Sequence, residues 1–321
     1  MIVGRPLALV LVALVLSSCG GSSSPPPAAP DGPFAIGQTN FVFVDTSRPT
    51  APHNGAPGAD SRTLPTTVYY PAAGNAGGSV QSNAPPVAGR RFPLIVFAHG
   101  LDAFAQVYSD ILHPWAAAGY VVAAPNFPLS NGGTPGGPVA DDYINQPADE
   151  SFVLDQVLEL DDDASSILHD LIDREQIGAS GQSLGGMTTF GIAFNTCCRD
   201  RRIRAAVPMA GQMVPYPAGE YEAEIGPPVL IIHGNADDTV PYQNAIDAYA
   251  FVLPPKLLLT HLGGGHILPY IGGGSRMALA ATIDASTAFF DLYLKNELGA
   301  RERLLAVGTR QGVTLQYELN G

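Results

Sequence analysis

The chain has 321 residues, of which 46% are hydrophobic and only 14% are charged, and its formal net charge is -13. The high hydrophobic share excludes a disordered acidic protein. The negative charge argues against nucleic acid as a partner, because phosphate binding needs clustered lysine and arginine. With only 3 cysteines, the chain is not a disulfide-built scaffold.

The N-terminus has the pattern of a targeting segment. Arg5 supplies a positive charge, and Leu7 to Leu16 form an apolar run too short to span a bilayer as a helix. The run ends in Leu16-Ser17-Ser18-Cys19, which resembles a bacterial lipoprotein signal. This resemblance implies a signal peptide over residues 1–18 and a lipidated Cys19 that anchors the protein to a membrane of the bacterial cell envelope, outside the cytoplasm. An ordinary secretory signal is the alternative.

Residues 19–34 are rich in Gly, Ser and Pro, and are expected to form a flexible tether. Residues 35–321 are expected to form one domain. Apolar and β-branched runs predict strands at 41–44, 66–70, 93–98, 120–124, 177–180, 203–209, 228–232 and 256–262. The first two are expected to be antiparallel strands near a sheet edge.

Helical patterns alternate with these strands. They cover 106–118, 149–173 with a charged break near 161–163, 184–195, 241–252 and 276–298, whereas 313–317 adds a last strand or packs as a tail. The alternation predicts the α/β class, with a mostly parallel central sheet and helices on both faces.

Three further segments have polar or reactive side chains. The loop 126–148 starts where a strand ends, so it is either a lid over a site or an ordinary surface loop. The run Asp161-Asp162-Asp163 is expected to cap a helix or face solvent, so no metal and no cofactor are predicted. The adjacent Cys197 and Cys198 either close a small strained disulfide ring or remain two thiols.

A nucleophile motif lies between a predicted strand and a predicted helix. Gly181-Gln182-Ser183-Leu184-Gly185 matches G-x-S-x-G, in which a tight turn exposes the serine and tiny residues must flank it. The helix that starts at Leu184 directs its N-terminal dipole at the position where negative charge would develop. Ser183 is therefore the predicted nucleophile.

The partners of a nucleophilic serine are a base and an acid that orients it. Asp237 and Asp238 follow the strand 228–232 and compete for the role of the acid. His266 follows three glycines after the strand 256–262 and is the predicted base, with His261 as its rival. Other histidines are expected to be structural: His99 shapes the oxyanion loop, His233 lies in the core, His113 and His169 lie on helices, and His53 lies in a loop without a partner.

The predicted oxyanion hole consists of two backbone N–H groups, those of Leu101 and Leu184. Leu101 follows His99-Gly100 directly after the strand 93–98. The predicted substrate-binding side chains lie near the same strand ends: Phe104, Gln182, Met187 and Phe127.

Over roughly residues 60–300 the chain resembles the α/β-hydrolase superfamily. The similar group holds platelet-activating-factor acetylhydrolases, dienelactone-hydrolase-like proteins and bacterial cutinases. This resemblance favours Asp237 over Asp238, and it implies Leu101 and Leu184 as the oxyanion donors. Dienelactone hydrolases proper have a cysteine in place of Ser183, and polyester hydrolases often have an aromatic residue in place of Gln182 or Leu101. The motifs that carry the resemblance are His99-Gly100-Leu101, Gly181 to Gly186, Gly234-x-x-Asp237-x-x-Val240-Pro241 and Gly265-His266.

The expected function is that of a secreted, membrane-anchored serine hydrolase of the esterase or lipase type. It would act as a monomer on the carboxylic ester bonds of a small-molecule or polymeric ester, through an acyl-enzyme. The alternatives are a cutinase-like polyester hydrolase, a non-catalytic binding lipoprotein on a hydrolase fold, and a serine peptidase. The order Ser183, Asp237, His266 argues against a binding protein, because loss of one member of the triad is the simple route to a non-enzyme.

Overall fold

A ten-stranded sheet runs through the part of the chain that the computed structural model describes, which is Met1 and residues 32–320. The predicted signal peptide, Cys19 and most of the predicted tether lie outside the described residues. Gly32–Gly321 form one compact unit. The strands are β1 (Ala35–Asp45), β2 (Arg62–Ala72), β3 (Gln81–Ser82), β4 (Phe92–Ala98), β5 (Val121–Pro125), β6 (Ile172–Gln182), β7 (Ile203–Met209), β8 (Val229–Gly234), β9 (Lys256–His261) and β10 (Val313–Glu318).

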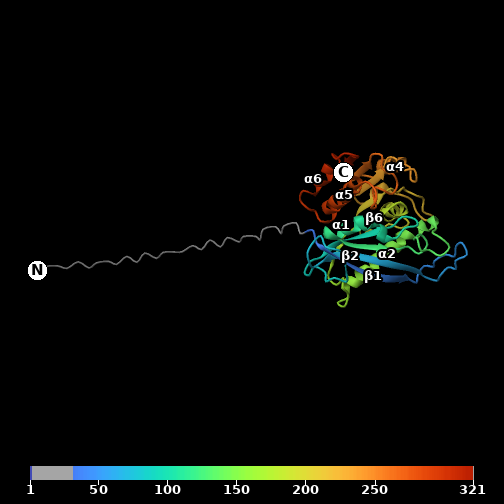
Figure 1. Cartoon of the computed structure of the whole chain (residues 1–321), viewed down its shortest axis with the longest axis horizontal. Helices are drawn as coiled ribbons and strands as arrows, with labels where there is room; N and C mark the ends of the chain where they lie inside the picture. The colour runs from blue at the N-terminus through green and yellow to red at the C-terminus, as the bar shows by residue number, and fades with distance from the viewer. Residues whose placement is uncertain (2–31, 321) are drawn as a thin grey trace. The chain divides into compact units, whose positions relative to one another are not determined.

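The strand order is β10-β9-β8-β7-β6-β4-β5-β2-β1-β3. The strands from β5 to β9 along this order are parallel, whereas β2 pairs antiparallel with β1 and β5, and β10 pairs antiparallel with β9. In Figure 1 the N-terminal strands β1 and β2 accordingly lie on one side of the unit and the C-terminal helices α5 and α6 on the other. The predicted α/β-hydrolase fold with its mostly parallel sheet is confirmed.

The helices cover both faces of this sheet. They are α1 (Ser109–Ala117), α2 (Gln146–Asp162), α3 (Leu184–Phe194), α4 (Gln243–Phe251), α5 (Arg276–Leu294) and α6 (Ala300–Val307), with short 3-10 turns at Ala105–Tyr108, Ala140–Ile144 and Ala223–Ile225. Buried side chains of α1, α5 and α6 form one core against the sheet, and those of α2, α3 and α4 form the cores on the other face. Neighbouring residues of β4 point alternately into the two faces, which explains its unbroken apolar sequence.

The helix predicted to extend to residue 173 ends at Asp162 instead, and β6 already begins at Ile172. Asp161 is the reason, because its buried carboxylate accepts hydrogen bonds from the backbone N–H groups of Leu171 (2.8 Å) and Ile172 (2.9 Å). This aspartate therefore fixes the turn between α2 and β6. As a consequence, His169 lies in a turn and not on the predicted helix.

The C-terminal part differs from prediction in two places. The last predicted helix stops at Leu294, and a separate helix, α6, follows it. Residues 313–317, predicted to be either a last strand or a packed tail, form the edge strand β10. Among the described helices, α5 alone is long and apolar enough to cross a membrane, but its buried side chains pack in the core against α1 and the sheet.

The long loop between β5 and α2 is anchored to the body of the protein. Arg62, fully buried in β2, donates hydrogen bonds to the carboxylates of Asp142 and Asp149 over 2.6–3.1 Å. The Gly137 carbonyl of the loop accepts a hydrogen bond from His53, and Tyr143 of the loop donates one to the Pro215 carbonyl. His53 thus has a partner, contrary to prediction, and these contacts favour a fixed wall over a hinged lid.

Cys197 and Cys198 form a disulfide bond just after the end of α3. The sequence was compatible with either a disulfide ring or two free thiols, and the structure contains the disulfide ring.

Candidate active site

Ser183 lies on a sharp turn between β6 and α3. Its φ of 59° and ψ of -118° are outside the regions that a non-glycine residue prefers, and this conformation exposes the side chain at the strand end. A Cβ atom at Gly181 would overlap the backbone of Gly185, and one at Gly185 would overlap the carbonyl of Ala98. The two glycines of the motif therefore permit the close approach of strand, turn and helix.

The structure brings the three residues of the predicted triad together. The Nε2 atom of His266 lies 2.8 Å from the Ser183 Oγ, and its Nδ1 atom lies 2.7 Å from an Asp237 carboxylate oxygen. Because an ionised carboxylate only accepts hydrogen bonds, the His266 proton sits on Nδ1, and Nε2 is left to accept from the serine hydroxyl. This geometry is that of a nucleophile, a general base and an orienting acid.

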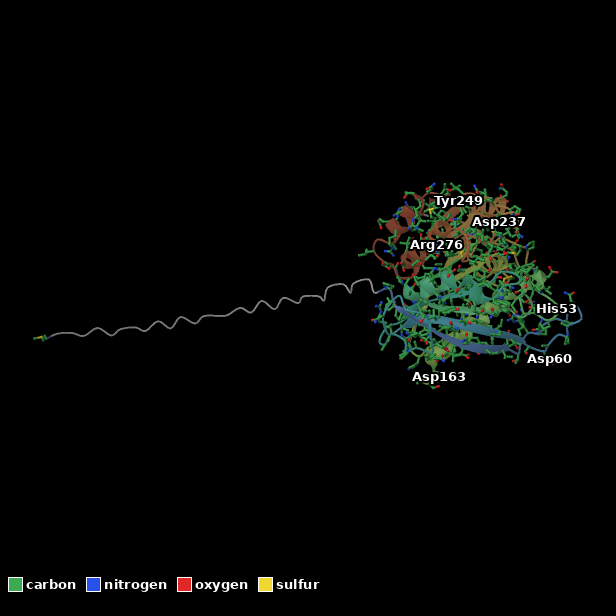
Figure 2. The ribbon with its side chains drawn as sticks, viewed as in Figure 1. His53, Asp60, Asp163, Asp237, Tyr249 and Arg276 are labelled. Carbon is green, nitrogen blue, oxygen red and sulfur yellow. A yellow bond between two sulfur atoms is a disulfide. The ribbon has the colours of Figure 1, made fainter. Side chains whose placement is uncertain are left out.

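The loops after β8 and β9 hold the acid and the histidine side by side. The carboxylate of Asp237 is fully buried, and its other oxygen accepts from the N–H groups of Thr239 (2.9 Å) and Val240 (2.8 Å). Asp238, the competing acid, is exposed, whereas Asp237 is buried. Figure 2 shows Asp237 in the C-terminal part of the chain, away from His53 in the loop between β1 and β2.

His233 touches the acid, a role that the sequence did not predict. It is buried as expected, but its Nε2 atom lies 2.9 Å from the Val240 carbonyl and 3.2 Å from the Asp237 carboxylate. Because both neighbours accept, Nε2 carries the proton, and burial lowers the pKa of His233. In the sequence, only the four-residue spacing between His233 and Asp237 indicated that the two side chains could be in contact.

His261, the rival base, lies away from the serine. It is buried in β9, and its Nε2 atom contacts the Thr282 hydroxyl at 2.9 Å. Burial lowers its pKa to about 4. His113 lies on α1 as predicted, where its ring packs edge-on against Tyr69.

The predicted oxyanion donors lie at the ends of two neighbouring strands. The parallel pairing of β4 with β6 aligns Ala98 with Gly181, so the residues that follow, Leu101 and Leu184, emerge on the same edge of the sheet. This is the point where the strand order reverses, the usual position of a ligand site in such sheets. Leu184 is the first residue of α3, so its N–H has no acceptor within the helix.

His99 holds the loop that contains Leu101, the predicted oxyanion donor, to the segment after β5. Its ring is fully buried, with Nδ1 2.7 Å from the Gly100 carbonyl and Nε2 3.0 Å from the backbone N–H of Phe127. The carbonyl accepts and the amide donates, so the proton is on Nδ1. Burial lowers the pKa of His99 to about 4, which keeps the ring neutral.

Two of the predicted substrate-binding residues are buried and contact other parts of the protein instead. Phe127 is fully buried in the core, with its ring 5.1 Å from that of His99, so it packs against the histidine and is not open to a ligand. Gln182 is buried and has both ends of its amide occupied, by Tyr108 and by the His266 carbonyl. Phe104 is exposed and Met187 is half-buried, so both side chains remain available to a ligand.

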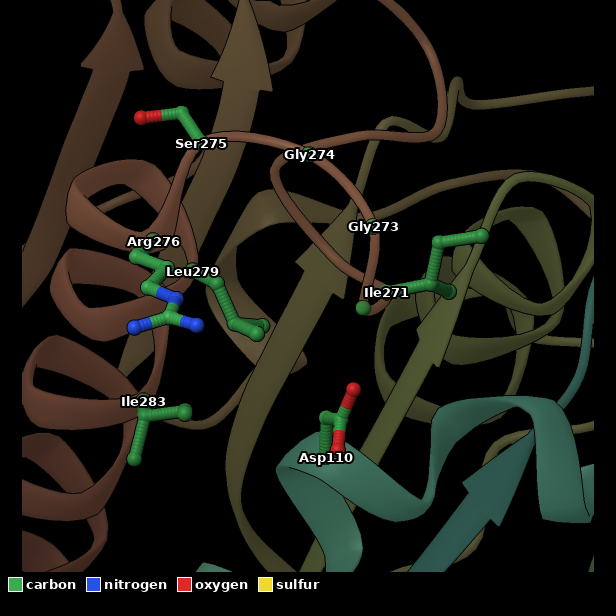
Figure 3. Close-up of a pocket in the computed structure, with 9 residues that line it drawn as sticks. Asp110, Ile271, Gly273, Gly274, Ser275, Arg276, Leu279 and Ile283 are labelled. Carbon is green, nitrogen blue, oxygen red and sulfur yellow. The ribbon is translucent and has the colours of Figure 1, made fainter.

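A pocket of about 370 Å³ lies beside α1 and the start of α5, and it contains none of the predicted site residues (Figure 3). Asp110 lines it from α1 and Arg276 from α5, while the glycine-rich loop before α5 forms the remaining wall. We do not assign the chemistry of Ser183 to this pocket.

Comparisons with known proteins agree with this fold and with the predicted resemblance. Residues 60–128, which include the oxyanion loop but not Ser183, match the family "Platelet-activating factor acetylhydrolase, isoform II". The platelet-activating factor acetylhydrolase of Bos taurus is 28% identical over 47% of this chain and 42% of its own length, and that of Canis lupus familiaris is 27% identical over the same shares. The match thus spans less than half of these curated relatives.

Among solved structures, a ferulic acid esterase from Streptomyces cinnamoneus is similar with a TM-score of 0.64 at 22% identity. The match covers 84% of this chain and 93% of the esterase. It supports the α/β-hydrolase fold over nearly the whole described unit.

Proposed function

We propose that this protein is a serine hydrolase of carboxylic esters, with Ser183 as nucleophile, His266 as base and Asp237 as orienting acid. The observation that carries the proposal is the unbroken contact from the Ser183 Oγ through the imidazole of His266 to the buried carboxylate of Asp237, with 2.8 Å and 2.7 Å separations. The matched relatives and the similar structure, by name acetylhydrolases and an esterase, support the same class of reaction.

The reaction would proceed through an acyl-enzyme. The Ser183 Oγ attacks the ester carbonyl carbon while its proton passes to the Nε2 of His266, and the N–H groups of Leu101 and Leu184 stabilise the resulting oxyanion. Collapse of this intermediate breaks the carbon–oxygen bond, and the imidazolium gives its proton to the departing alcohol. Water then repeats the sequence and releases the acid. Asp237 stabilises the imidazolium throughout.

Substitution of the nucleophile tests this proposal. Ser183→Ala should lower kcat on p-nitrophenyl acetate by at least about 10⁴-fold, because the covalent route is lost. Asp237→Asn should cost on the order of 10⁴-fold by disturbing the histidine tautomer, whereas the matched Asp238→Asn should leave kcat within a factor of two or so. Turnover by Ser183→Ala near that of the wild type would refute the proposal. A folded wild-type protein that hydrolyses no ester in a panel of chain lengths would favour the non-catalytic binding protein.

We further propose that residues 1–18 are a signal peptide, that Cys19 is lipidated, and that the mature protein is an extracytoplasmic, membrane-anchored monomer. The apolar run and the Leu16-Ser17-Ser18-Cys19 sequence support the anchor. The wild type expressed in a bacterial host should incorporate labelled palmitate and sediment with membranes, and Cys19→Ala should do neither. Equal labelling of the variant would contradict the assignment. The sedimentation coefficient of the residue 32–321 fragment tests whether the protein is a monomer.

A further inference from the structure

A buried hydrogen-bond bridge joins the three segments that carry the proposed chemistry. Its two side chains are Tyr108, at the end of the turn Ala105–Tyr108, and Gln182, the residue before the nucleophile. Both are at most 4% exposed. The bridge connects the oxyanion loop at Gly100, the turn at Ser183 and the loop of His266.

The order of donors in this bridge follows from one group that can only accept. The backbone carbonyl of His266 accepts a hydrogen bond of 2.8 Å from the side chain of Gln182, so the amide nitrogen must face His266. The amide oxygen therefore faces Tyr108 and accepts from its hydroxyl at 2.7 Å. The hydroxyl in turn accepts from the backbone N–H of Gly100 at 3.1 Å.

Each polar side-chain atom of the bridge has a hydrogen-bond partner, and both side chains are buried. Burial raises the pKa of Tyr108 to about 12, so its hydroxyl keeps the proton that it donates to Gln182. A Cβ atom at Gly100 would lie only 2.9 Å from the Tyr108 oxygen and 3.0 Å from the Gln182 amide oxygen. The glycine therefore lets the oxyanion loop rest directly on the bridge.

The bridge acts next to the amide that is proposed to bind the oxyanion. On one side of Leu101, the N–H of Gly100 is held by Tyr108, and on the other side the N–H of Asp102 donates to the Ser130 carbonyl at 2.9 Å. Among the described residues no acceptor is recorded for the N–H of Leu101 itself. This arrangement fixes the peptide units on both sides and leaves the central donor available.

We propose that Tyr108 and Gln182 are positioning residues, which hold the Leu101 amide and the His266 imidazole at fixed places relative to Ser183. This inference rests on the proposed function. It replaces the substrate-binding role predicted for Gln182, since both ends of its buried amide already have partners within the protein. Neither side chain touches the reacting atoms, so both act through the groups that they hold.

Two single variants remove different parts of the bridge. Tyr108→Phe keeps the ring, which packs against Phe97 at 5.0 Å between ring centroids, but frees the Gly100 N–H and the Gln182 oxygen. Gln182→Glu, assayed at a pH where the new carboxyl is ionised, keeps an acceptor for Tyr108 but offers no donor to the His266 carbonyl. Each should lower kcat on p-nitrophenyl acetate by about 10- to 100-fold with KM nearly unchanged, because small displacements of catalytic groups have effects of this size.

A second readout separates positioning from a general loss of stability. Binding of an aryl trifluoromethyl ketone, which forms an oxyanion on the serine, should weaken in Tyr108→Phe by about the same factor as kcat. Tyr70→Phe is the matched control, because Tyr70 is also buried and donates its hydroxyl to the Ala84 carbonyl at 2.8 Å, outside the site. This control should lose stability but keep kcat. The effect of the double variant Tyr108→Phe/Gln182→Leu on kcat should be smaller than the combined effects of Tyr108→Phe and Gln182→Leu, because both substitutions remove the hydrogen bond between the two side chains.

The proposal is overturned if the folded variants Tyr108→Phe and Gln182→Glu both keep kcat and ketone affinity within about twofold of the wild type. It is also overturned if Tyr70→Phe loses as much activity as they do. If Tyr108→Phe fails to fold, Gln182→Glu alone decides the outcome by the same measurements. Ser183→Ala in the same assay distinguishes this proposal from the proposed function. If Ser183→Ala is inactive while the Tyr108 and Gln182 variants keep full activity, the positioning role is refuted and the proposed esterase function stands.

Discussion

At the scale of single residues, the environment of each histidine decides its chemistry. His266 is in contact with both a hydroxyl and a carboxylate, whereas His99 and His261 are buried among neutral groups. Burial disfavours the charged form, and it lowers the pKa of both His99 and His261 to about 4. The folded protein therefore keeps these two rings neutral at a pH where an unfolded chain would protonate them.

This difference predicts acid sensitivity. Between pH 6.5 and 4 the unfolded state binds protons that folded His99 and His261 do not, so the free energy of unfolding falls as the pH falls. Each histidine should contribute a loss on the order of 3 kcal/mol at pH 4. Urea unfolding at pH 7 and pH 4.5 measures how much the free energy of unfolding falls between these pH values. This fall should be smaller in His261→Gln than in the wild type. Equal pH dependence in the variant and the wild type would contradict this account.

Glu150 is the opposite case. It is fully buried in α2, and neither of its carboxylate oxygens has a hydrogen-bond partner among the described residues. Burial, followed by the nearby charges of Asp149 and Asp200, raises its pKa well above the usual value. The folded state therefore retains a proton that the unfolded state releases, and stability falls as the pH rises above the ordinary pKa of a glutamate.

Glu150→Gln should accordingly stabilise the protein at pH 8. The substitution keeps the shape of the side chain but removes its ionisation, so its advantage over the wild type should shrink as the pH is lowered toward 4. Thermal unfolding of both proteins at pH 4.5 and pH 8 checks this expectation. A difference in stability that does not change with pH would show that ionisation of Glu150 is not the cause.

At the scale of elements, the approach of α3 to β4 sets the geometry of the nucleophile. Glycine at position 185 allows the helix to start against the Ala98 carbonyl, and glycine at 181 allows the strand to reach the same point. The result is a helix N-terminus that faces the Ser183 side chain. Ser183 is thus positioned by backbone contacts of the two motif glycines.

Gly185→Ala should displace this helix. Its added methyl group would overlap the Ala98 carbonyl, so we expect a loss of stability of about 1–3 kcal/mol or more together with reduced esterase activity. Gly78→Ala is the matched control, because a Cβ atom there would meet nothing closer than an oxygen at 3.8 Å. Its effect should stay within about 0.5 kcal/mol. Denaturant unfolding of both variants provides the comparison, and equal stabilities would argue against the role of this contact.

At the scale of the whole molecule, buried charges fasten the long loop to the sheet. Arg62 in β2 pairs with Asp142 in the loop and with Asp149 in α2, and all three side chains are essentially inaccessible. Arg48 reaches the same Asp149 from the segment after β1. Segments that are distant in sequence are thereby held in one network, which explains why a loop so rich in glycine and proline is ordered.

Arg62→Met should destabilise the protein by about 3–5 kcal/mol, because it leaves the buried Asp142 without its ion-pair partner and the buried Asp149 with Arg48 alone. Arg310→Met removes the exposed ion pair with Asp284 and should change stability by less than about 1 kcal/mol. Thermal unfolding distinguishes the two variants. Proteolysis within residues 129–145 should also increase in Arg62→Met, since the loop loses its anchor, and an unchanged cleavage rate would contradict the anchoring role.

The sequence by itself determined the fold class, the strands of the central sheet and the candidates for the triad. The apolar runs predicted the central strands correctly, because a strand that is buried on both faces of a sheet has few polar residues. The G-x-S-x-G motif was reliable because its glycines are required by contacts within a few residues and by one adjacent strand. Residues at the ends of neighbouring parallel strands meet at one edge of the sheet, and so Ser183 and His266 were candidates from their positions. Position left Asp237 and Asp238 in competition for the acid, and the family resemblance favoured Asp237.

The tertiary structure shows that Asp237 is buried in contact with His266, whereas Asp238 is exposed. It also shows that His266 contacts Ser183, whereas His261 contacts Thr282. It also moved Phe127 into the core, assigned Gln182 to a bridge, and brought Tyr108 and His233 to the site. These assignments depend on contacts between segments far apart in the chain, such as the 74 positions between Tyr108 and Gln182. Local patterns carry no information about such pairs, because the pairing is set by how the sheet and its loops pack.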